Sequence, residues 1–242
     1  MLRERPGPPR VLEGGEGDVL VSLHGGGGLH HDPALELLAE QFHVIAPELP
    51  GFAAGAPAPA SFDELAEAVA VLLDEADVDT CTLAGTSFGA VVALHLALAA
   101  PERIAALVLL SPAVFAAGAG PPPQDIERAL FAREGGPRPP RDPDELVRQR
   151  HAMVASLLDS IDEGDLLERL PSLELATLVV CGTQDGLFGS QHGHVFRELL
   201  PNCSSVLLYG AAHELGWDRP EALAALIGDF ARRREAFVVT SR

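Results

Sequence analysis

The sequence predicts an α/β protein in which a mostly parallel sheet carries helices on both faces. Short runs of apolar and β-branched residues alternate along the chain with longer segments whose apolar residues recur at three- and four-residue spacing. The short runs are almost continuously apolar, which is typical of parallel strands buried on both faces. Such alternation favours βαβ units with right-handed crossovers. With 242 residues, 47% of them hydrophobic, the chain can bury one large core.

The individual elements follow from these two patterns. The predicted strands are residues 19–23, 43–47, 79–85, 104–111, 177–182 and 204–210, and the predicted helices are residues 33–42, 61–77, 88–100 and 219–234. Ser61 and Glu64 stand three residues apart at the start of the second helix, as in a capping box. Asp32 before Pro33 indicates the cap of the first helix.

Residues 112–172 interrupt the alternation. The segments 112–124 and 135–145 are rich in proline and glycine and hold neither regular helix nor central strand. Residues 125–134 and 144–162, in contrast, have helical patterns. Long excursions from a compact domain tend to be lids or binding loops. We therefore predict a helical cap, or lid, at 112–172, inserted into a core formed by residues 1–111 and 173–242.

Composition excludes several classes of partner. The chain has 17 basic and 35 acidic residues, a formal charge of −18, and every basic residue is arginine. This disfavours nucleic acid and anionic membrane surfaces, because phosphate contacts need clustered cations. The first residues lack the apolar core of a secretory signal, and no run is long enough for a transmembrane helix. Three cysteines, Cys81, Cys181 and Cys203, fit small core residues in a reducing compartment. We expect a cytoplasmic protein with a small-molecule substrate, and a homo-oligomer is left open.

A Gly-x-Ser-x-Gly pattern lies between a predicted strand and a predicted helix, at Gly85-Thr86-Ser87-Phe88-Gly89. A serine on such a turn adopts strained dihedrals and projects its hydroxyl from the carboxyl edge of the sheet, and the flanking glycines let strand and helix approach. The alternative is an ordinary turn with a capping serine. The surrounding pattern favours Ser87 as a nucleophile, which needs a base at neutral pH.

The candidate base is His213, which lies in the loop after the last predicted strand and would return to the same sheet edge. His95 lies within an apolar helix and is expected to pack there. His43 opens a strand. His192 and His194 lie in a glycine-containing loop and are expected at the surface.

The candidate acid is Asp185, just after the buried strand 177–182. A carboxylate in that position would orient the imidazole of the base and stabilise its charged form. Glu48 and Asp218 are the rivals, since the first follows a strand and the second lies near His213. The order Ser87, Asp185, His213 leaves room for the insertion between the first two residues.

Together these residues resemble the α/β-hydrolase superfamily, in its serine-nucleophile, esterase- and lipase-like branch. The resemblance runs from about Val11 to Arg234 and is carried by LHGGGG, APELPGF, GTSFGA, APERIAALVLLSPA, GTQDG and GAAH. It implies a Ser87–His213–Asp185 triad, an α/β-hydrolase sheet of about eight strands, a variable cap and no cofactor. Two departures stand out. The short N-terminus raises the question whether the first edge strand is missing, and Ala90 stands where many relatives have a second glycine.

The run HGGGGLHHD, residues 24–32, admits three interpretations. A phosphate loop would need a lysine that the chain lacks, and the dinucleotide fingerprint places a histidine where its last glycine belongs. A metal site is disfavoured, because His30, His31 and Asp32 are adjacent and have no further ligand at convincing spacing. The resemblance instead implies an oxyanion hole formed by the amide of Phe88 and by one of this loop, Gly26 first, then Gly25 or Gly27. His24 would orient the loop.

We therefore predict a serine hydrolase that cleaves a small to medium, largely apolar ester, or a related acyl substrate, through an acyl-enzyme. Within the same class, a carbon–carbon bond hydrolase, a cofactor-free perhydrolase or a lyase would use the same residues. The alternative of another class is a ligand-binding receptor or a weakly active relative.

Overall fold

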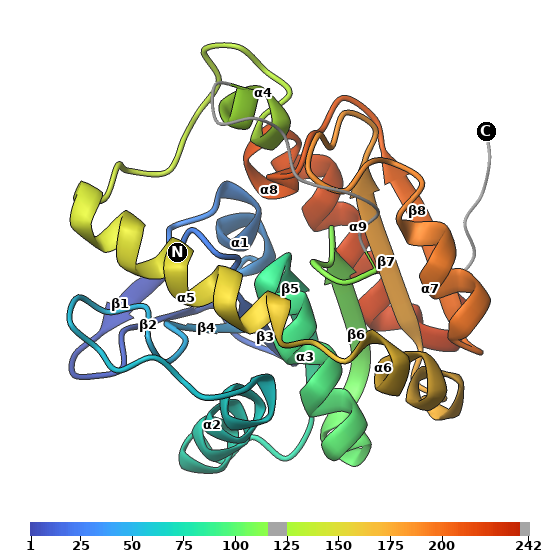
Figure 1. Cartoon of the computed structure of the whole chain (residues 1–242). Coiled ribbons are helices and arrows are strands. Elements are labelled where there is room, and N and C mark those ends of the chain that lie inside the picture. The colour runs from blue at the N-terminus through green and yellow to red at the C-terminus, as the bar shows by residue number, and fades with distance from the viewer. Residues whose placement is uncertain (116–124, 238–242) are drawn as a thin grey trace.

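The computed structural model describes residues 1–115 and 125–237, and in this part eight strands form a single sheet (Figure 1). The order across the sheet is β1-β2-β4-β3-β5-β6-β7-β8. The strands are β1 (Arg3–Arg5), β2 (Val11–Gly14), β3 (Val19–Leu23), β4 (His43–Pro47), β5 (Cys81–Thr86), β6 (Ile104–Leu110), β7 (Thr177–Gly182) and β8 (Cys203–Leu208). β2 runs antiparallel to β1 and β4, and the other neighbours are parallel. The predicted mostly parallel α/β sheet is confirmed.

The N-terminal edge of the sheet answers the question that the short N-terminus raised. Arg3–Arg5 pairs with β2 in the register Arg3 to Glu13, so an edge strand is present. The sequence pattern missed it because all three residues of β1 are exposed and polar, and its place depends on backbone pairing rather than on burial. The six strands that were predicted are all present, with ends within two residues of the predicted ones.

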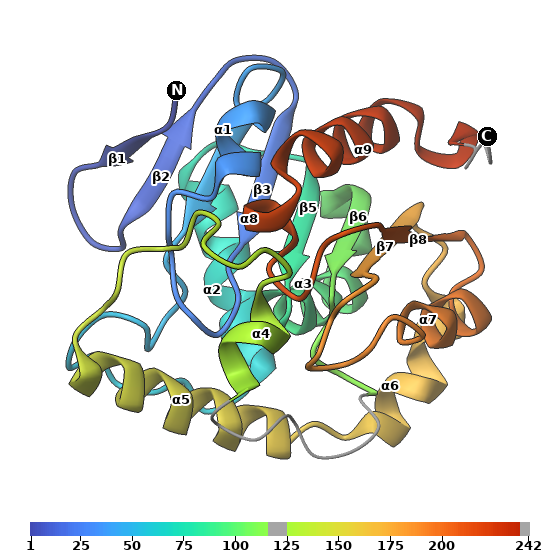
Figure 2. The ribbon, with the colours of Figure 1, turned by 90° about the horizontal axis from the view of Figure 1, so that it is seen from above.

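Helices cover both faces of the sheet, as predicted (Figure 2). The helices of the described residues are α1 (Pro33–Leu38), α2 (Phe62–Glu75), α3 (Phe88–Ala99), α4 (Ile126–Leu130), α5 (Asp144–Asp159), α6 (Glu163–Arg169), α7 (Gly193–Leu199), α8 (Leu215–Asp218) and α9 (Pro220–Arg233), with short 3-10 turns at Pro101–Arg103, Leu170–Ser172 and Arg234–Ala236. Both predicted caps are present, because Asp32 accepts from the Ala34 amide at 2.7 Å and Ser61 accepts from the Glu64 amide at 3.2 Å.

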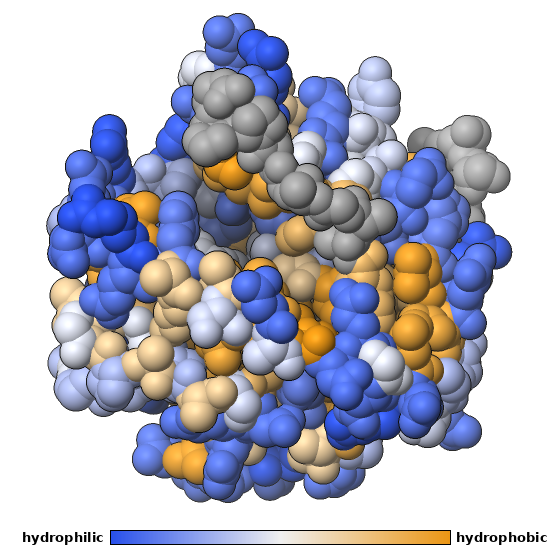
Figure 3. Space-filling model, in the orientation of Figure 1, coloured by the Kyte–Doolittle hydropathy of each residue, from blue (hydrophilic) through white to orange (hydrophobic). Residues whose placement is uncertain are grey.

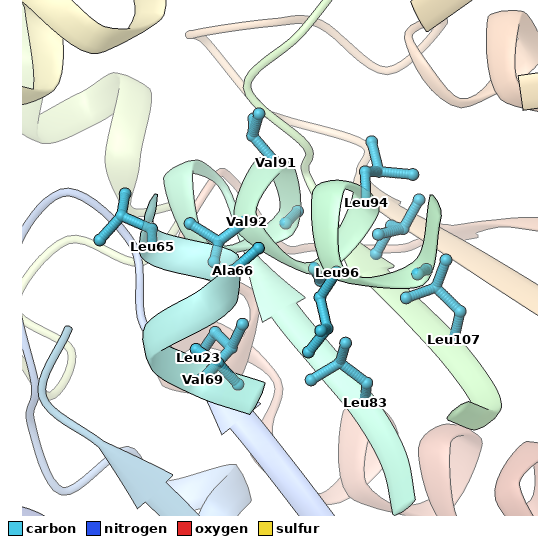
Figure 4. Packing of buried hydrophobic residues seen from close by; sticks show 14 of the residues in the cluster. Leu23, Leu65, Ala66, Val69, Leu83, Val91, Val92, Leu94, Leu96 and Leu107 are labelled. Atoms are coloured by element: carbon cyan, nitrogen blue, oxygen red, sulfur yellow. The ribbon is translucent and has the colours of Figure 1, made fainter. Parts of the chain in front are cut away.

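Two layers of apolar side chains hold the helices on the sheet. On one face, α2 and α3 pack on the central strands, where Leu65, Val92 and Leu96 belong to the same apolar cluster as Leu23 and Leu83 (Figure 4). On the other face, α1 and α9 bury residues such as Leu38, Ile227 and Phe230 against the same strands. Burying one Leu, Ile or Phe side chain completely contributes roughly 1.5–3 kcal/mol to the stability of the fold. The two layers therefore hold the strands, and with them the edge of the sheet that carries the site, in place.

The segment between β6 and β7 contains α4, α5 and α6. The predicted helical segments 125–134 and 144–162 contain α4 and α5, and α6 follows where no helix was predicted. The predicted irregular stretch 112–124 lies largely outside the described residues. Figures 1 and 2 show α5 as a long helix lying on the outside of the core.

The visible surface is mainly hydrophilic, with apolar residues in patches among the charged ones (Figure 3). This agrees with the 35 acidic residues of the chain. None of the helices in the described residues has the length and apolarity that crossing a bilayer requires.

Candidate active site

Ser87 occupies the junction between β5 and α3 in a strained backbone conformation, with φ 52° and ψ −112°. A side chain at Gly85 would come within 2.3 Å of the Gly89 carbonyl, and one at Gly89 within 2.4 Å of the Leu23 carbonyl. Both positions therefore require glycine. The Ser87 amide donates to the Leu110 carbonyl at 2.8 Å, which ties the turn to β6. A non-glycine residue held in such a sparsely populated conformation costs roughly 1–3 kcal/mol, and residues of this kind cluster at active sites.

His213 and Asp185 form a buried hydrogen-bonded pair at the same edge of the sheet. Nδ1 of His213 lies 3.0 Å from Oδ2 of Asp185, and both side chains are almost completely enclosed. The strands before them, β7 and β8, are parallel neighbours, so their carboxyl ends meet. A side chain at Gly182 would lie 2.1 Å from the Ala212 carbonyl, so this glycine lets the two loops touch.

The Asp185 carboxylate is held in its charged form. Burial alone would raise its pKa, but the hydrogen bond and charge of His213, with the amides of Phe188 and Leu187, outweigh burial and lower the pKa to about 2. Those amides donate to Oδ1 at 3.1 and 2.9 Å. The second oxygen is thereby left for the imidazole, which orients its ring.

The two rival acids have other partners. Asp218 accepts from the amides of Ala132 and Ala212 at 2.9 and 2.8 Å, so it fastens the His213 loop to the segment after α4. Glu48 pairs with Arg10 at 3.3 Å and Arg150 at 3.6 Å. Of the three acids, the structure brings only Asp185 to the imidazole of His213.

Ser87 and His213 lie at the same carboxyl edge, but in the described residues the structure records no hydrogen bond between them. Such bonds are often long in proteins without substrate and tighten in the complex, so their absence here does not separate the two residues.

The other histidines have separate surroundings. His95 is half-buried on α3, stacks on Phe62 and contacts Asp63 at 2.7 Å, as expected for a packing residue. The prediction that His192 lies at the surface is wrong. It is 5% exposed, because α7 begins next to it and the rings of Phe188 and Phe196 pack against it. His194 is exposed, as predicted.

The four glycines form a tight turn beside Ser87. The Gly28 amide donates to the Gly25 carbonyl at 3.1 Å, which places Gly26 and Gly27 at the tip. A side chain at Gly25 would lie 3.5 Å from Cβ of Ser87, and one at Gly26 would lie 3.4 Å from Val154 of α5. Phe88 opens α3, so its amide has no acceptor within the helix. The structure thus brings Gly25 beside Ser87, with Gly26 at the tip of the same turn and Phe88 next to Ser87 in the chain.

His24 links this turn to the next loop. Its Nε2 accepts from the Leu49 amide at 3.0 Å, so its Nδ1 carries the proton and donates to the Gly25 carbonyl at 2.8 Å. Burial, opposed by the hydrogen bond to Gly25, lowers its pKa to about 3, which keeps the ring neutral. These contacts match the loop-orienting position that the sequence suggested for His24.

The adjacent His30, His31 and Asp32 do not converge. His30 contacts the Gly27 carbonyl at 3.3 Å, His31 contacts Glu36 at 3.2 Å, and Asp32 caps α1. In the described ranges there is no group of three or more histidine, cysteine or acidic side chains suited to a metal ion.

Three neighbours of the site were missed by the sequence reasoning. Phe188 lies edge-on to His213 with ring centroids 5.1 Å apart, and Val154 lies over Gly26. Arg150 reaches the glycine turn from α5 and donates to the Gly27 carbonyl at 2.8 Å. The available signal was a charge on an apolar helix face, since Arg150 is followed at helical spacing by Met153, Val154 and Leu157, which all pack inward.

Comparison with known proteins decides the family. A family model described as "alpha/beta hydrolase fold" matches residues 18–151, more than half of the chain. This chain belongs to the alpha/beta hydrolase fold family. The predicted family, fold class and hydrolase enzyme class are confirmed.

Individual relatives cover nearly the whole chain. A pimeloyl-[acyl-carrier protein] methyl ester esterase of Yersinia enterocolitica is 31% identical and covers 90% of this chain and 95% of its own length. A 2-hydroxy-6-oxo-6-phenylhexa-2,4-dienoate hydrolase of Burkholderia cepacia is 24% identical over 90% of this chain and 89% of its own. The crystal structure of a bacterial membrane phospholipase A superposes with a TM-score of 0.73 and 27% identity, and the match covers 96% of this chain and 86% of that one.

Proposed function

We propose that this α/β hydrolase is a serine esterase in which Ser87, His213 and Asp185 form the catalytic triad. The observation that carries the proposal is the strained Ser87 turn at the sheet edge where the buried His213–Asp185 pair also lies. An esterase of 31% identity over 90% of the chain supports the same class of reaction.

The chemistry follows from the positions of the groups. Nε2 of His213 takes the proton of the Ser87 hydroxyl as the oxygen attacks the ester carbonyl. The negative charge that develops on the carbonyl oxygen is met by the amides of Gly26 and Phe88. Loss of one such donor costs about 2.7–4 kcal/mol in other enzymes. His213 then gives its proton to the departing alcohol, and water releases the acid from Ser87 by the same steps in reverse.

The surroundings favour a small, largely apolar substrate. Val154 and Phe188 lie beside the reacting groups. A cavity of about 210 Å³ borders the site through Gly25 and Thr86. Its lining combines apolar residues such as Leu130, Phe131 and Trp217 with the polar side chains of His30, Asp32 and Glu214. Ligand pockets for drug-sized molecules have volumes of roughly 300–1,000 Å³, so this cavity suits a short acyl or alkoxy group. The acidic chain disfavours a polyanionic substrate.

Residues 112–172 would act as the cap of this enzyme, with residues 1–111 and 173–242 as its core. The contacts of α5 support the division, since Val154 lies over Gly26 and Arg150 donates to Gly27. We also propose that the enzyme works in the cytoplasm, where the unpaired Cys81, Cys181 and Cys203 would stay reduced.

A fluorophosphonate probe and a panel of nitrophenyl and methyl esters of increasing chain length test the proposal. We expect labelling of Ser87 in the wild type, hydrolysis of the shorter esters, and a loss of about a thousandfold or more in kcat in Ser87→Ala, with no labelling. A folded wild type that is neither labelled nor active on any ester would exclude the enzyme and favour a ligand-binding role.

A carbon–carbon bond hydrolase is the second candidate, because a relative of 24% identity is named as a dienoate hydrolase. The same triad can serve either substrate. A vinylogous diketone substrate added to the panel separates the two, since turnover of it exceeding that of every ester would favour this candidate.

A further inference from the structure

Arg150 is a buried arginine on α5 whose guanidinium lies between two loops of the core. It is 4% exposed. Its Nε donates to the Phe52 carbonyl at 2.9 Å and its Nη1 to the Gly27 carbonyl at 2.8 Å. Asp142 at 2.7 Å and Glu48 at 3.6 Å balance its charge. A buried charge with both carbonyl and carboxylate partners holds a fixed position, because losing any partner leaves it uncompensated.

The peptide groups of the glycine turn connect Arg150 to the Gly26 amide. Arg150 donates to the Gly27 carbonyl, and the Gly28 amide in the same planar peptide group donates to the Gly25 carbonyl. The Gly25 carbonyl in turn shares its peptide group with the Gly26 amide. In a trans peptide group the N–H and the C=O point in opposite directions. A hydrogen bond that fixes the carbonyl of one peptide group therefore also fixes the direction of the N–H in the same group.

Gly28 shows that the turn is built around this contact. Its φ is +97°, and a side chain there would lie 2.4 Å from Nη1 of Arg150. The position therefore requires glycine both for its backbone conformation and for the space that the guanidinium occupies. Gly27, by contrast, has open space where its side chain would be.

We propose that Arg150 is a positioning residue for the oxyanion hole and that the insertion supplies it. Through two peptide groups it orients the Gly26 N–H and polarises it, because hydrogen bonds in a chain strengthen one another when one end carries a charge. The inference rests on the proposed esterase function. Under this inference α5, which lies outside the α/β core, sets how strongly the Gly26 N–H binds the negative charge that develops on the substrate oxygen.

The test compares Arg150→Met with Arg148→Met. Arg148 lies two residues away on the same helix, is exposed and pairs with Glu145, so it is a matched control. For Arg150→Met we expect kcat to fall roughly ten- to a hundredfold, less than the roughly 10²–10³ for complete loss of a donor, with KM changed less than about threefold. Affinity for an alkyl boronic acid, whose adduct is tetrahedral, should fall by the same factor as kcat/KM. Arg148→Met should match the wild type.

Amide hydrogen exchange of peptides covering residues 24–28 gives a readout that does not need activity. Exchange should be faster in Arg150→Met than in Arg148→Met, and unchanged in the peptides of β5 and β7. Equal exchange, or equal kcat and boronic acid affinity in an active enzyme, would overturn the inference. An inactive wild type with faster loop exchange in Arg150→Met would refute the esterase proposal while showing that Arg150 holds the loop.

If Arg150→Met does not fold, Arg150→Lys against Arg148→Lys replaces the pair. Lysine keeps the charge but cannot match the fixed fork of donors that reaches Gly27, Phe52 and Asp142. Several-fold lower kcat with faster loop exchange would support the inference, and values equal to Arg148→Lys would contradict it.

Discussion

The two sides of the site are held by different parts of the chain. The side that carries the proposed base is built within the core, where Asp185 is fixed by the amides of Leu187 and Phe188 and His213 is fixed by Asp185. The side that carries the proposed oxyanion donors is a glycine turn without side chains of its own. It is held by His24 from within and by Arg150 from α5.

Because different parts of the chain hold the two sides, we expect each side to respond to substitutions in a different part of the chain. Changes in the insertion should reach the glycine turn and leave the His213–Asp185 pair intact, whereas changes in β7 or β8 should do the reverse. A rigid base with an adjustable oxyanion side would let a cap influence turnover without altering the acid–base pair.

Asp185→Asn should lower kcat by about a thousandfold or more while the protein stays folded. The amide cannot stabilise the imidazolium that forms when His213 takes the serine proton, and it favours the wrong tautomer of the ring. Asp218→Asn is the control, because Asp218 binds the amides of Ala132 and Ala212 and not His213. The measurement is the steady-state kcat of both variants on one nitrophenyl ester. Comparable losses of kcat in the two variants would contradict the assignment of Asp185 as the acid of the triad.

The core side is also the part that the sequence predicted best. Ser87 lies in a pattern of strand, glycines and helix that is complete within about twenty residues, and Asp185 and His213 each follow a strand. Because carboxyl ends of parallel strands meet at one edge, their proximity follows from the order of elements alone.

The parts that the sequence missed depend on contacts between distant residues. β1 is a strand only because β2 pairs with it, and its three polar residues have no pattern of their own. The burial of His192 depends on the rings of Phe188 and Phe196 around it. The partners of Arg150 at Gly27 and Phe52 stand 123 and 98 residues earlier in the chain, so no local pattern reveals them.

Asp32 lies where the two sides of the site meet, and its titration should affect stability. It follows the glycine turn, its carboxylate lies against Gly216 of α8, and Glu214 lies next to His213. Burial, with the charge of Glu214, raises the pKa of Asp32 to about 7. The hydrogen bonds from the amides of Ala34 and Leu35 oppose this shift. Since the unfolded value is about 3.9, the folded state binds the extra proton between pH 4 and 7, and stability should fall as pH rises through that range.

Asp32→Asn should remove that dependence and make the protein more stable than the wild type at pH 8, by about 2–4 kcal/mol. Asparagine also serves as a helix cap, so α1 keeps its start. Urea unfolding at pH 5 and pH 8 measures the difference. Asp162→Asn, at the exposed start of α6, is the matched control. A wild-type stability that is flat or rises between pH 5 and 8, unaltered by Asp32→Asn, would show that this carboxyl is already ionised.

Gly28→Ala should affect the oxyanion side alone. The alanine must adopt φ +97° and displace the Arg150 guanidinium, so we expect a loss of about 1–2 kcal/mol in unfolding free energy and a several-fold fall in kcat. Gly27→Ala is the control for stability, because its φ is not positive and its side chain would meet open space. If the two glycine variants unfold at the same urea concentration, the turn is not built around Arg150, and the division between a core-held base and an insertion-held oxyanion side loses its main support.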